Sequence, residues 1–185
     1  NHKDLEIPLD ELPLIDPPSN DSNITKQELE YIKKLPKATK FDKENDLDFS
    51  STFADFLNYV NDGPGAKNIN KKEISNYSKR IRNIVIALKN HFNRPRPQQL
   101  GYFHEVPLDS YQSLSGNSPS YPSGHSVQPF AIATALSEEY PELKTELFNI
   151  ADEIAKGRMR MKIHFPSDYE YGKMLGILIG KRLDI

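Results

Sequence analysis

The chain has 185 residues, with 24 Lys and Arg against 26 Asp and Glu and a formal net charge of -2. This length suits one domain with its own hydrophobic core. The absence of cysteine excludes disulfides, thiolate nucleophiles and cysteine-ligated zinc. The basic residues form no long patch, which argues against nucleic acid as a partner.

The longest apolar runs, residues 84–88 and 174–179, are much shorter than the roughly 18 residues that span a bilayer. We therefore expect a protein that is not embedded in a membrane. The sequence begins with Asn1 rather than methionine and leaves the compartment open. A periplasmic or secreted location and a cytoplasmic one both fit, depending on whether a signal peptide preceded Asn1.

Residues 1–22 carry prolines at positions 8, 13, 17 and 18 and a polar run at 19–22. So many helix and strand breakers predict an extended proline-rich arm rather than regular structure. Leucine and isoleucine side chains recur within the arm, so we expect it to pack on a single helical domain formed by residues 23–185.

Three helices are predicted in the first half of this domain. Thr25 and Glu28 have the spacing of a capping box, and the helix that they begin stops at Pro36. A second helix covers 47–60, where apolar residues gather on one side. Apolar positions recur every three or four residues from 71 to 91, which predicts a long amphipathic helix with Lys89 in its last turn.

Residues 98–122 lack any sustained period and are rich in Ser, Pro, Gly and Tyr, so we expect a long ordered loop. Helices follow from Gly124 to Tyr140 and from Pro141 toward Arg158. Ser167 is the expected N-cap of a last helix that begins at Asp168. No strand pattern competes, and the predicted fold class is all-α, a compact helical bundle.

The last helix has glycines at positions 172, 176 and 180, a four-residue spacing that allows another helix to approach closely. The approaching helix can belong to the same bundle or to a second subunit. A homo-oligomer therefore stays open as an alternative to a monomer.

Lys89 and Arg96 form the first candidate site. Pro95 and Pro97 prevent a helix there, so Arg96 leaves the helix in an extended conformation while Lys89 stays on it. The two cations can then converge on one anion from different directions. Arg94 also precedes a proline and can serve in place of Arg96, and for either residue alone a solvated surface cation is the more ordinary interpretation.

Ser123, Gly124 and His125 form the second candidate site, at the start of a predicted helix. A helix N-terminus offers free N–H groups and the positive end of the helix dipole, glycine allows close approach, and the serine hydroxyl adds a donor. His125 at the rim can protonate a leaving group. An ordinary Ser-capped helix with a surface histidine fits these residues about equally well.

The third candidate site combines Arg158, His164 and Asp168. The Asp168 carboxylate can accept a hydrogen bond from the Nδ1–H of His164. This leaves Nε2 unprotonated, so that it can act as a nucleophile. A His–Asp capping interaction beside a solvated Arg158 is the structural alternative. His125, His164 and Asp168 can also be arranged as a metal-binding facial triad. The three cations expected beside these residues argue against a metal ion, which would add further positive charge.

These three stretches together resemble the signature of the type 2 phosphatidic acid phosphatase superfamily, which also holds class A nonspecific acid phosphatases and vanadium haloperoxidases. The superfamily pattern is Lys-x6-Arg-Pro, then Pro-Ser-Gly-His, then Ser-Arg-x5-His-x3-Asp. The chain matches it in order across residues 89–168, except that Gly157 stands where the family usually has serine. The loss of that hydroxyl puts a supporting contact in doubt more than the chemistry.

The resemblance implies a helical bundle of the acid phosphatase and vanadium haloperoxidase type, acting as a metal-independent phosphatase on phosphomonoesters. His164 would attack phosphorus to give a phosphohistidine, Asp168 would orient it, and His125 would protonate the leaving oxygen. The phosphate oxygens would be held by Lys89, Arg96, Arg158 and the backbone at Ser123 and Gly124. Because one histidine must be neutral and the other protonated, we expect a bell-shaped pH profile with an acidic to neutral optimum.

Two other functions are weighed against this one. A vanadium haloperoxidase would use the same cations to hold vanadate as its cofactor, although known enzymes of that type are much longer chains. A noncatalytic anion-binding protein would keep the fold without turnover. The polar 98–120 loop favours a small water-soluble phosphorylated substrate over a lipid. His91 and His104 receive no role, although the loop position of His104 would allow it to touch substrate.

Overall fold

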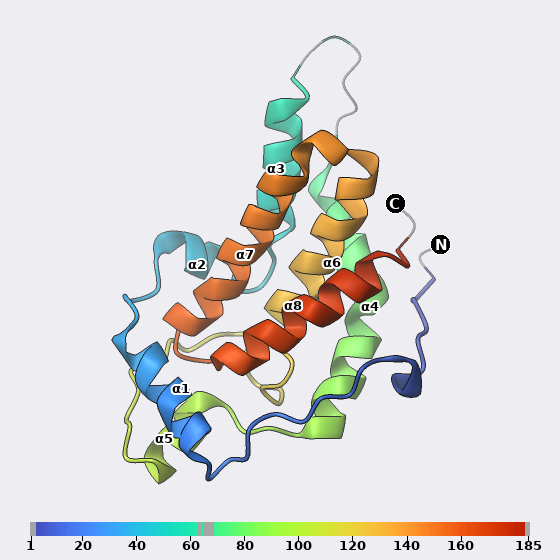
Figure 1. Cartoon of the computed structure of the whole chain (residues 1–185). Coiled ribbons are helices and arrows are strands. Elements are labelled where there is room, and N and C mark those ends of the chain that lie inside the picture. The colour runs from blue at the N-terminus through green and yellow to red at the C-terminus, as the bar shows by residue number, and fades with distance from the viewer. Residues whose placement is uncertain (1–2, 63, 65–68, 184–185) are drawn as a thin grey trace.

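The computed structural model describes residues 3–62, 64 and 69–183 (Figure 1), and every regular element in this part of the chain is a helix. The short 3-10 helices are η1 (Leu9–Glu11) and η2 (Pro141–Leu143). The α-helices are α1 (Asn23–Lys34), α2 (Lys40–Glu44), α3 (Ser50–Val60), α4 (Lys71–Phe92), α5 (Pro97–Phe103), α6 (Gly124–Glu139), α7 (Lys144–Arg160) and α8 (Pro166–Gly180). The all-α prediction is confirmed.

The predicted long helices are present within a few residues of their expected bounds. The α4 helix begins after an Asn70 cap whose side chain accepts from Glu73 N, and it ends at Asn93, which adopts a left-handed φ of 49°. Such a residue commonly ends a helix. Lys89 lies in the last turn of α4, as expected.

The predicted helix starts in the first half of the chain were partly wrong. Ser22, not Thr25, caps α1, and its side chain accepts from Thr25 N. The Glu28 side chain takes no part in that cap. The second helix, expected from residue 47, begins at Ser50, and Leu47 lies exposed before it.

Two short helices were missed. Thr39 and Asp42 form a capping box that starts α2, a helix of only five residues that shows no apolar period. The α5 helix lies inside the segment predicted to be a loop and begins with Pro97 at its first position, where proline is favoured. The loop that precedes α6 is therefore limited to residues 104–123. The predicted Ser167 cap is also wrong, because α8 begins at Pro166 after Phe165 and places Asp168 at its third position.

The α6 helix is the centre of the bundle and contacts α4, α7 and α8 (Figure 1). Its residues are buried on nearly all sides, which is typical of a central helix. The glycines of α8 face it: a Cβ built on Gly176 would lie 2.6 Å from Val127 O, and one on Gly180 would lie 2.6 Å from Ala131 O. The close helix contact that the glycine spacing predicted thus lies inside the bundle.

Residues 3–22 run along the outside of α4, cross its C-terminal end and lead to α1 (Figure 1). Ile7 and Leu12 are buried against the α4, α6 and α8 core. The tyrosine hydroxyls of Tyr121 and Tyr171 donate to Ile15 O and Pro13 O, both at 2.8 Å. The single turn of η1 is the one regular element in this segment, where none was predicted. Among the described residues, no helix combines the length and the apolar character needed to cross a membrane.

Candidate active site

The predicted site residues come from four places along the chain and converge at one end of the bundle. Lys89 lies near the end of α4, and Arg96 precedes α5 in an extended conformation (φ -72°, ψ 158°), as Pro97 requires. Gly124 begins α6 next to Lys89, because a Cβ built on Gly124 would lie 4.0 Å from Lys89 Cε. The remaining residues lie in the last turn of α7 and around the start of α8.

His164 and Asp168 form a buried pair in which His164 Nδ1 lies 3.0 Å from Asp168 Oδ2. The pair forms because His164 precedes α8 while Asp168 lies in its first turn, where its carboxylate also accepts from Phe165 N at 2.8 Å. This bond to the carboxylate fixes Nδ1 as the protonated nitrogen of the ring. Nε2 is then left with its lone pair.

Arg96 lies directly against that lone pair, with Nη1 2.8 Å from His164 Nε2. Burial lowers the pKa of His164 well below its ordinary value, and the charges of Arg96 and Lys89 lower it further. The imidazole is therefore neutral, as a nucleophile must be. Because Arg96 Nη1 points at Nε2, an anion bound to this guanidinium would lie next to the nitrogen of His164.

The Arg94 side chain does not lie where it could serve in place of Arg96. Its side chain is fully buried and faces away from His164 Nε2, with Nη1 2.8 Å from Asp168 Oδ1 and 2.7 Å from Ser167 Oγ. The guanidinium also lies 3.9 Å from the centre of the Phe165 ring. The idea that Arg94 can replace Arg96 is wrong, because Arg94 is committed to the carboxylate that orients His164.

Glu28 on α1 completes this support. Its carboxylate accepts from Ser167 N at 2.6 Å and from Ser167 Oγ at 2.9 Å, and it lies 3.4 Å from Arg94 Nη2. Ser120 also donates to Asp168 Oδ2. Burial raises the pKa of Asp168, while Arg94 and Ser120 act to lower it. Without these donors the buried carboxyl would hold its proton more strongly.

The two predicted phosphate-binding cations near α5 are now bonded to backbone carbonyls. Lys89 Nζ donates to Pro119 O at 2.7 Å, and Arg96 Nε donates to Ser118 O at 2.8 Å. Burial, together with the charge of Arg96, lowers the pKa of Lys89 to about 7. Burial likewise lowers the pKa of Arg96 to about 10. Both shifts come mainly from the desolvation of buried cations, which the Asp168 carboxylate only partly offsets.

Arg158, the third cation, is paired with a residue that the sequence did not single out. Its Nη1 lies 2.6 Å from Asp46 Oδ1, and its Nη2 lies 2.9 Å from Ser115 Oγ. Asp46 is buried, which raises its pKa, but hydrogen bonds from Ser113 and Arg158 outweigh burial and lower it overall. The Asp46 carboxylate is therefore ionised and accompanies Arg158 as a counter-ion.

One loop thus supplies oxygen atoms to all three cations. Residues 113–119 contribute serine hydroxyls to Arg158 and backbone carbonyls to Arg96 and Lys89. A phosphate that binds these cations must take the place of at least some of these oxygen atoms. We refer to residues 113–119 as the cover loop.

Ser123, Gly124 and His125 lie at the start of α6, as expected. Ser123 N is bonded to Asp168 O at 3.2 Å, so its backbone amide is not free for an anion, contrary to the prediction. The Ser123 hydroxyl, in contrast, is buried without a partner. An unsatisfied buried hydroxyl at a helix N-terminus suits a phosphate oxygen.

His125 is partly buried, and its ring contacts the Phe49 ring at a centroid distance of 5.6 Å. Its Nε2 lies 3.0 Å from Asn45 O. Burial and the charge of Arg158 lower its pKa to about 3. His125 is therefore neutral when no anion is present, and a bound dianion would raise its pKa by offsetting Arg158.

A steric contact explains why Gly157 stands where the family usually has serine. A Cβ at this position would lie 2.6 Å from Asp42 Oδ1, and the Asp42 carboxylate is held in place by Arg160 at 2.8 Å. The Asp42–Arg160 pair occupies the space that a serine side chain would need. Sequence reasoning could not find this pair, because α2 was itself missed.

His91 and His104 contact none of the site residues. His91 is exposed and lies against the Phe92 ring, and His104 Nε2 lies 2.6 Å from Asn20 O. In the described part of the chain, no three His, Asp or Glu side chains are arranged to hold a metal ion. The metal triad considered for His125, His164 and Asp168 is not formed, since His125 bonds to Asn45 instead.

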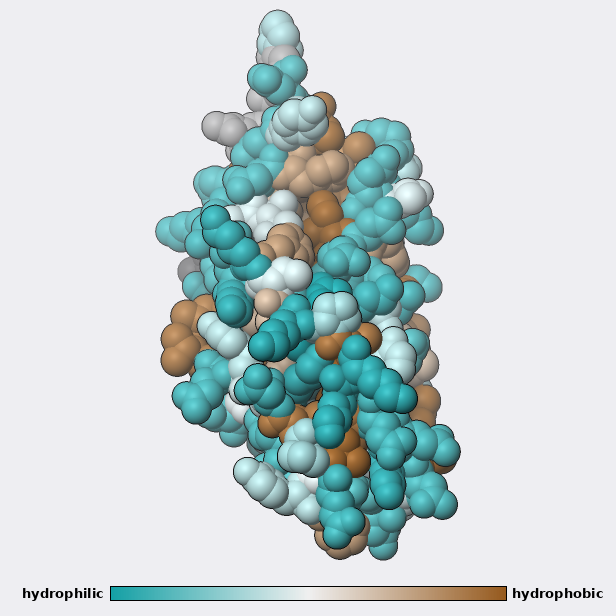
Figure 2. All heavy atoms as spheres, turned by 90° about the vertical axis from the view of Figure 1, so that its left-hand side faces the viewer, coloured by the Kyte–Doolittle hydropathy of each residue, from teal (hydrophilic) through white to brown (hydrophobic). Residues whose placement is uncertain are grey.

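The surroundings of the site are mainly polar. A cavity of about 470 Å³ lies beside Arg96 and is lined by α5 residues and by residues 116–119 of the cover loop. Figure 2 views the side of the molecule on which α1 and α2 lie and shows a largely hydrophilic surface with small, separate hydrophobic areas. On this face, no broad apolar entrance suited to a lipid chain is visible.

A comparison with protein-family models identifies residues 77–183 as a match to the PAP2 superfamily. The chain belongs to this superfamily. The matched range exceeds half of the 185 residues and holds all of the predicted site residues. Members of the superfamily are generally phosphatases, which makes a hydrolase the coarse expectation for this PAP2 protein. A search of the curated proteins gives no match. Glu28, Asp42 and Asp46 lie outside the matched range.

Proposed function

We propose that this PAP2 protein is a metal-independent, acid phosphatase-like phosphomonoesterase that acts through a phosphohistidine at His164. The observation that carries the proposal is the buried His164–Asp168 pair with Arg96 Nη1 placed 2.8 Å from Nε2. In support, the pair leaves a neutral imidazole nitrogen facing a guanidinium, which suits a nucleophile and a cation for the transferred phosphoryl group.

In the first step, His164 Nε2 attacks phosphorus and the bond from phosphorus to the ester oxygen breaks. The leaving oxygen takes a proton from His125, whose protonated form is stabilised by the bound dianion. Near pH 6 a substrate monoanion can also bring this proton itself, because the second pKa of a phosphate ester is about 6. Asp168 stabilises the imidazolium that forms at His164.

In the second step, a water molecule attacks the phosphohistidine while His125 accepts one of its protons. The bond between phosphorus and Nε2 breaks, and inorganic phosphate leaves. Lys89, Arg96, Arg158 and the Ser123 hydroxyl hold the equatorial oxygens as negative charge develops, which is the largest contribution expected in phosphoryl transfer. The polar surroundings of the cover loop favour small water-soluble phosphomonoesters.

The test is phosphate release from an aryl phosphate in chelator, measured across pH 5 to 7 for the wild type, His164→Ala and the matched exposed control His91→Ala. We expect a bell-shaped profile, retained activity in chelator, and loss only in His164→Ala. Quenching with denaturant at alkaline pH during turnover should trap phosphate on the wild-type protein in a base-stable form that later acid treatment releases.

Activity that His164→Ala retains, or a rate that rises steadily to alkaline pH, would refute this mechanism. Halide oxidation by peroxide that requires added vanadate would instead identify the haloperoxidase. Anion binding without either reaction would leave the noncatalytic function.

A further inference from the structure

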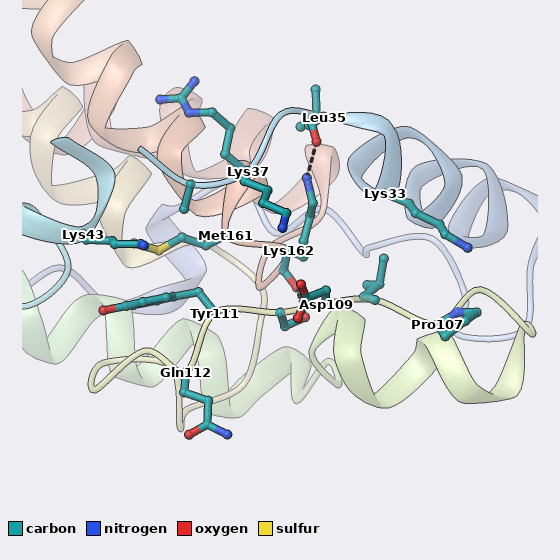
Figure 3. A pocket seen from close by; sticks show the side chains of 14 residues that line it. Lys33, Leu35, Lys37, Lys43, Pro107, Asp109, Tyr111, Gln112, Met161 and Lys162 are labelled. Atoms are coloured by element: carbon teal, nitrogen blue, oxygen red, sulfur yellow. Dashed lines mark hydrogen bonds between the residues drawn. The ribbon is translucent and has the colours of Figure 1, made fainter. Parts of the chain in front are cut away.

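A second cavity, of about 740 Å³, lies beside the catalytic end of the bundle (Figure 3). It is bounded by the end of α1, the linker after it, Lys43 of α2, the 107–112 segment and residues 160–162. Its size is within the range of small-molecule binding sites. The residues of the catalytic mechanism do not line it, so the proposed reaction does not account for it.

The lining of this cavity is strongly basic. Its cations are Lys33, Lys37, Lys43, Arg160 and Lys162, against the single carboxylate of Asp109. This concentration of positive charge occurs in a chain whose formal net charge is -2. A concave site lined by one sign of charge focuses its field and attracts counter-ions.

Three of these cations have no carboxylate partner. In the described part of the chain, Lys33, Lys37 and Lys43 form no ion pair, whereas Lys71 and Lys156 lie 3.5 Å and 2.7 Å from Asp48 and Asp152. The three come from different segments: the last turn of α1, the linker after it, and α2. Exposed lysines on one helix face are ordinarily just solvated, but these three line one cavity from different segments.

The floor of the cavity is fixed and partly apolar. Lys162 is buried, and its Nζ donates to Leu35 O at 2.6 Å, which ties the α1 end to the segment after α7 (Figure 3). Tyr111 supplies an aromatic wall, with Lys43 Nζ 5.6 Å from its ring centroid. Leu35 adds aliphatic surface. A site of this composition suits an organic anion better than a bare inorganic ion.

We propose that this cavity is a separate binding site for a small organic molecule that carries at least two phosphate or carboxylate groups. Lys33, Lys37 and Lys43 contact its anionic groups, while Tyr111 and Leu35 contact its organic part. Arg160 is already paired with Asp42 and contributes mainly to the field. Residues 107–112, which form one wall of the cavity, continue directly into the cover loop. The cover loop in turn contacts Lys89, Arg96 and Arg158.

The test uses titration calorimetry with pyrophosphate and with ADP, each in excess inorganic phosphate to occupy the catalytic cations. The variant is Lys33→Gln/Lys37→Gln/Lys43→Gln. The matched control is Lys26→Gln/Lys34→Gln/Lys40→Gln, which removes the same charge from exposed lysines of α1 and α2 that do not line the cavity. We expect the cavity variant to bind at least about tenfold more weakly, the control to match the wild type within about twofold, and ADP to bind more tightly than pyrophosphate.

Asp109→Asn removes the one carboxylate of the lining. We expect this variant to bind both ligands more tightly than the wild type. Aryl phosphate hydrolysis should be unchanged in the cavity variant, so failure of the proposed phosphatase activity would not affect this test. No binding by the wild type, or equal binding by all variants, would overturn the proposal.

Discussion

At the residue scale, the arrangement around Asp168 shows why His164 needs more than one partner. Asp168 is fully buried, and burial raises the pKa of its carboxyl, which favours the protonated form, a weaker acceptor for His164 Nδ1. Arg94 opposes this with a direct ion pair, and Glu28 holds Arg94 and Ser167 in place. We therefore regard Arg94 and Glu28 as positioning residues of the proposed nucleophile.

The first prediction concerns Arg94→Gln and the milder Glu28→Gln. Because Arg94 lowers the pKa of Asp168, its removal should move the acidic limb of the kcat/KM profile to higher pH and reduce activity about tenfold or more. Glu28→Gln should move the same limb by a smaller amount, and Arg94→Lys should restore part of the shift. Melting temperatures of the same variants distinguish a change in the pKa of Asp168 from a general loss of stability. A lower stability with an unmoved acidic limb would contradict it.

The second prediction concerns Gly157, where the family usually has serine. In Gly157→Ser the new Cβ would lie 2.6 Å from Asp42 Oδ1, a carboxylate that Arg160 holds rigidly. We expect a loss of about 1–3 kcal/mol in the free energy of unfolding, measured with urea. Adding Asp42→Ala should recover part of the loss if the clash is its cause. Two independent, additive losses would argue against that cause.

At the element scale, the contact between α6 and α8 holds the site together, because α6 carries His125 and α8 carries Asp168. The third prediction is that Gly176→Ala costs about 1–3 kcal/mol, since its Cβ would lie 2.6 Å from Val127 O. Helix propensity alone predicts the opposite, a gain of up to about 1 kcal/mol. Leu178→Ala on the exposed side of α8 is the control and should change stability much less. A stabilised Gly176→Ala protein would show that the two helices can separate without cost.

The cover loop is the element that sequence reasoning described least well. A polar loop that includes these residues was predicted, with bounds that were too wide, but its contacts with Lys89, Arg96 and Arg158 depend on bonds between residues 22 to 45 positions apart. The same limit applies to Asp46 and Glu28, whose partners Arg158 and Ser167 lie 112 and 139 residues away. No local pattern signals such pairs. Lys89, Arg96 and His164 were found because proline and glycine motifs mark their positions.

At the scale of the whole molecule, the buried cations connect folding to pH. Burial lowers the pKa of Lys89 to about 7 in the folded protein, whereas in the unfolded chain it has its ordinary value near 10.5. Between these two values the unfolded state binds more protons than the folded state. Stability should therefore rise with pH across this window. The cluster of Lys89, Arg96 and Arg158 thus makes the anion-free protein less stable near neutral pH than the rest of its core would allow.

The fourth prediction follows from this linkage. Urea unfolding of the wild type should give a free energy that increases from pH 7 to pH 9.5, and Lys89→Met, which removes the titrating group but keeps most of its length, should show a smaller increase. Saturating inorganic phosphate should reduce the increase in the wild type, because a bound anion raises the pKa of Lys89 back toward its ordinary value. Lys72→Met, an exposed position on the same helix, is the control and should follow the wild type. Equal slopes in the wild type and Lys89→Met would mean that Lys89 is protonated in the folded protein, stabilised by the carbonyl of Pro119 alone.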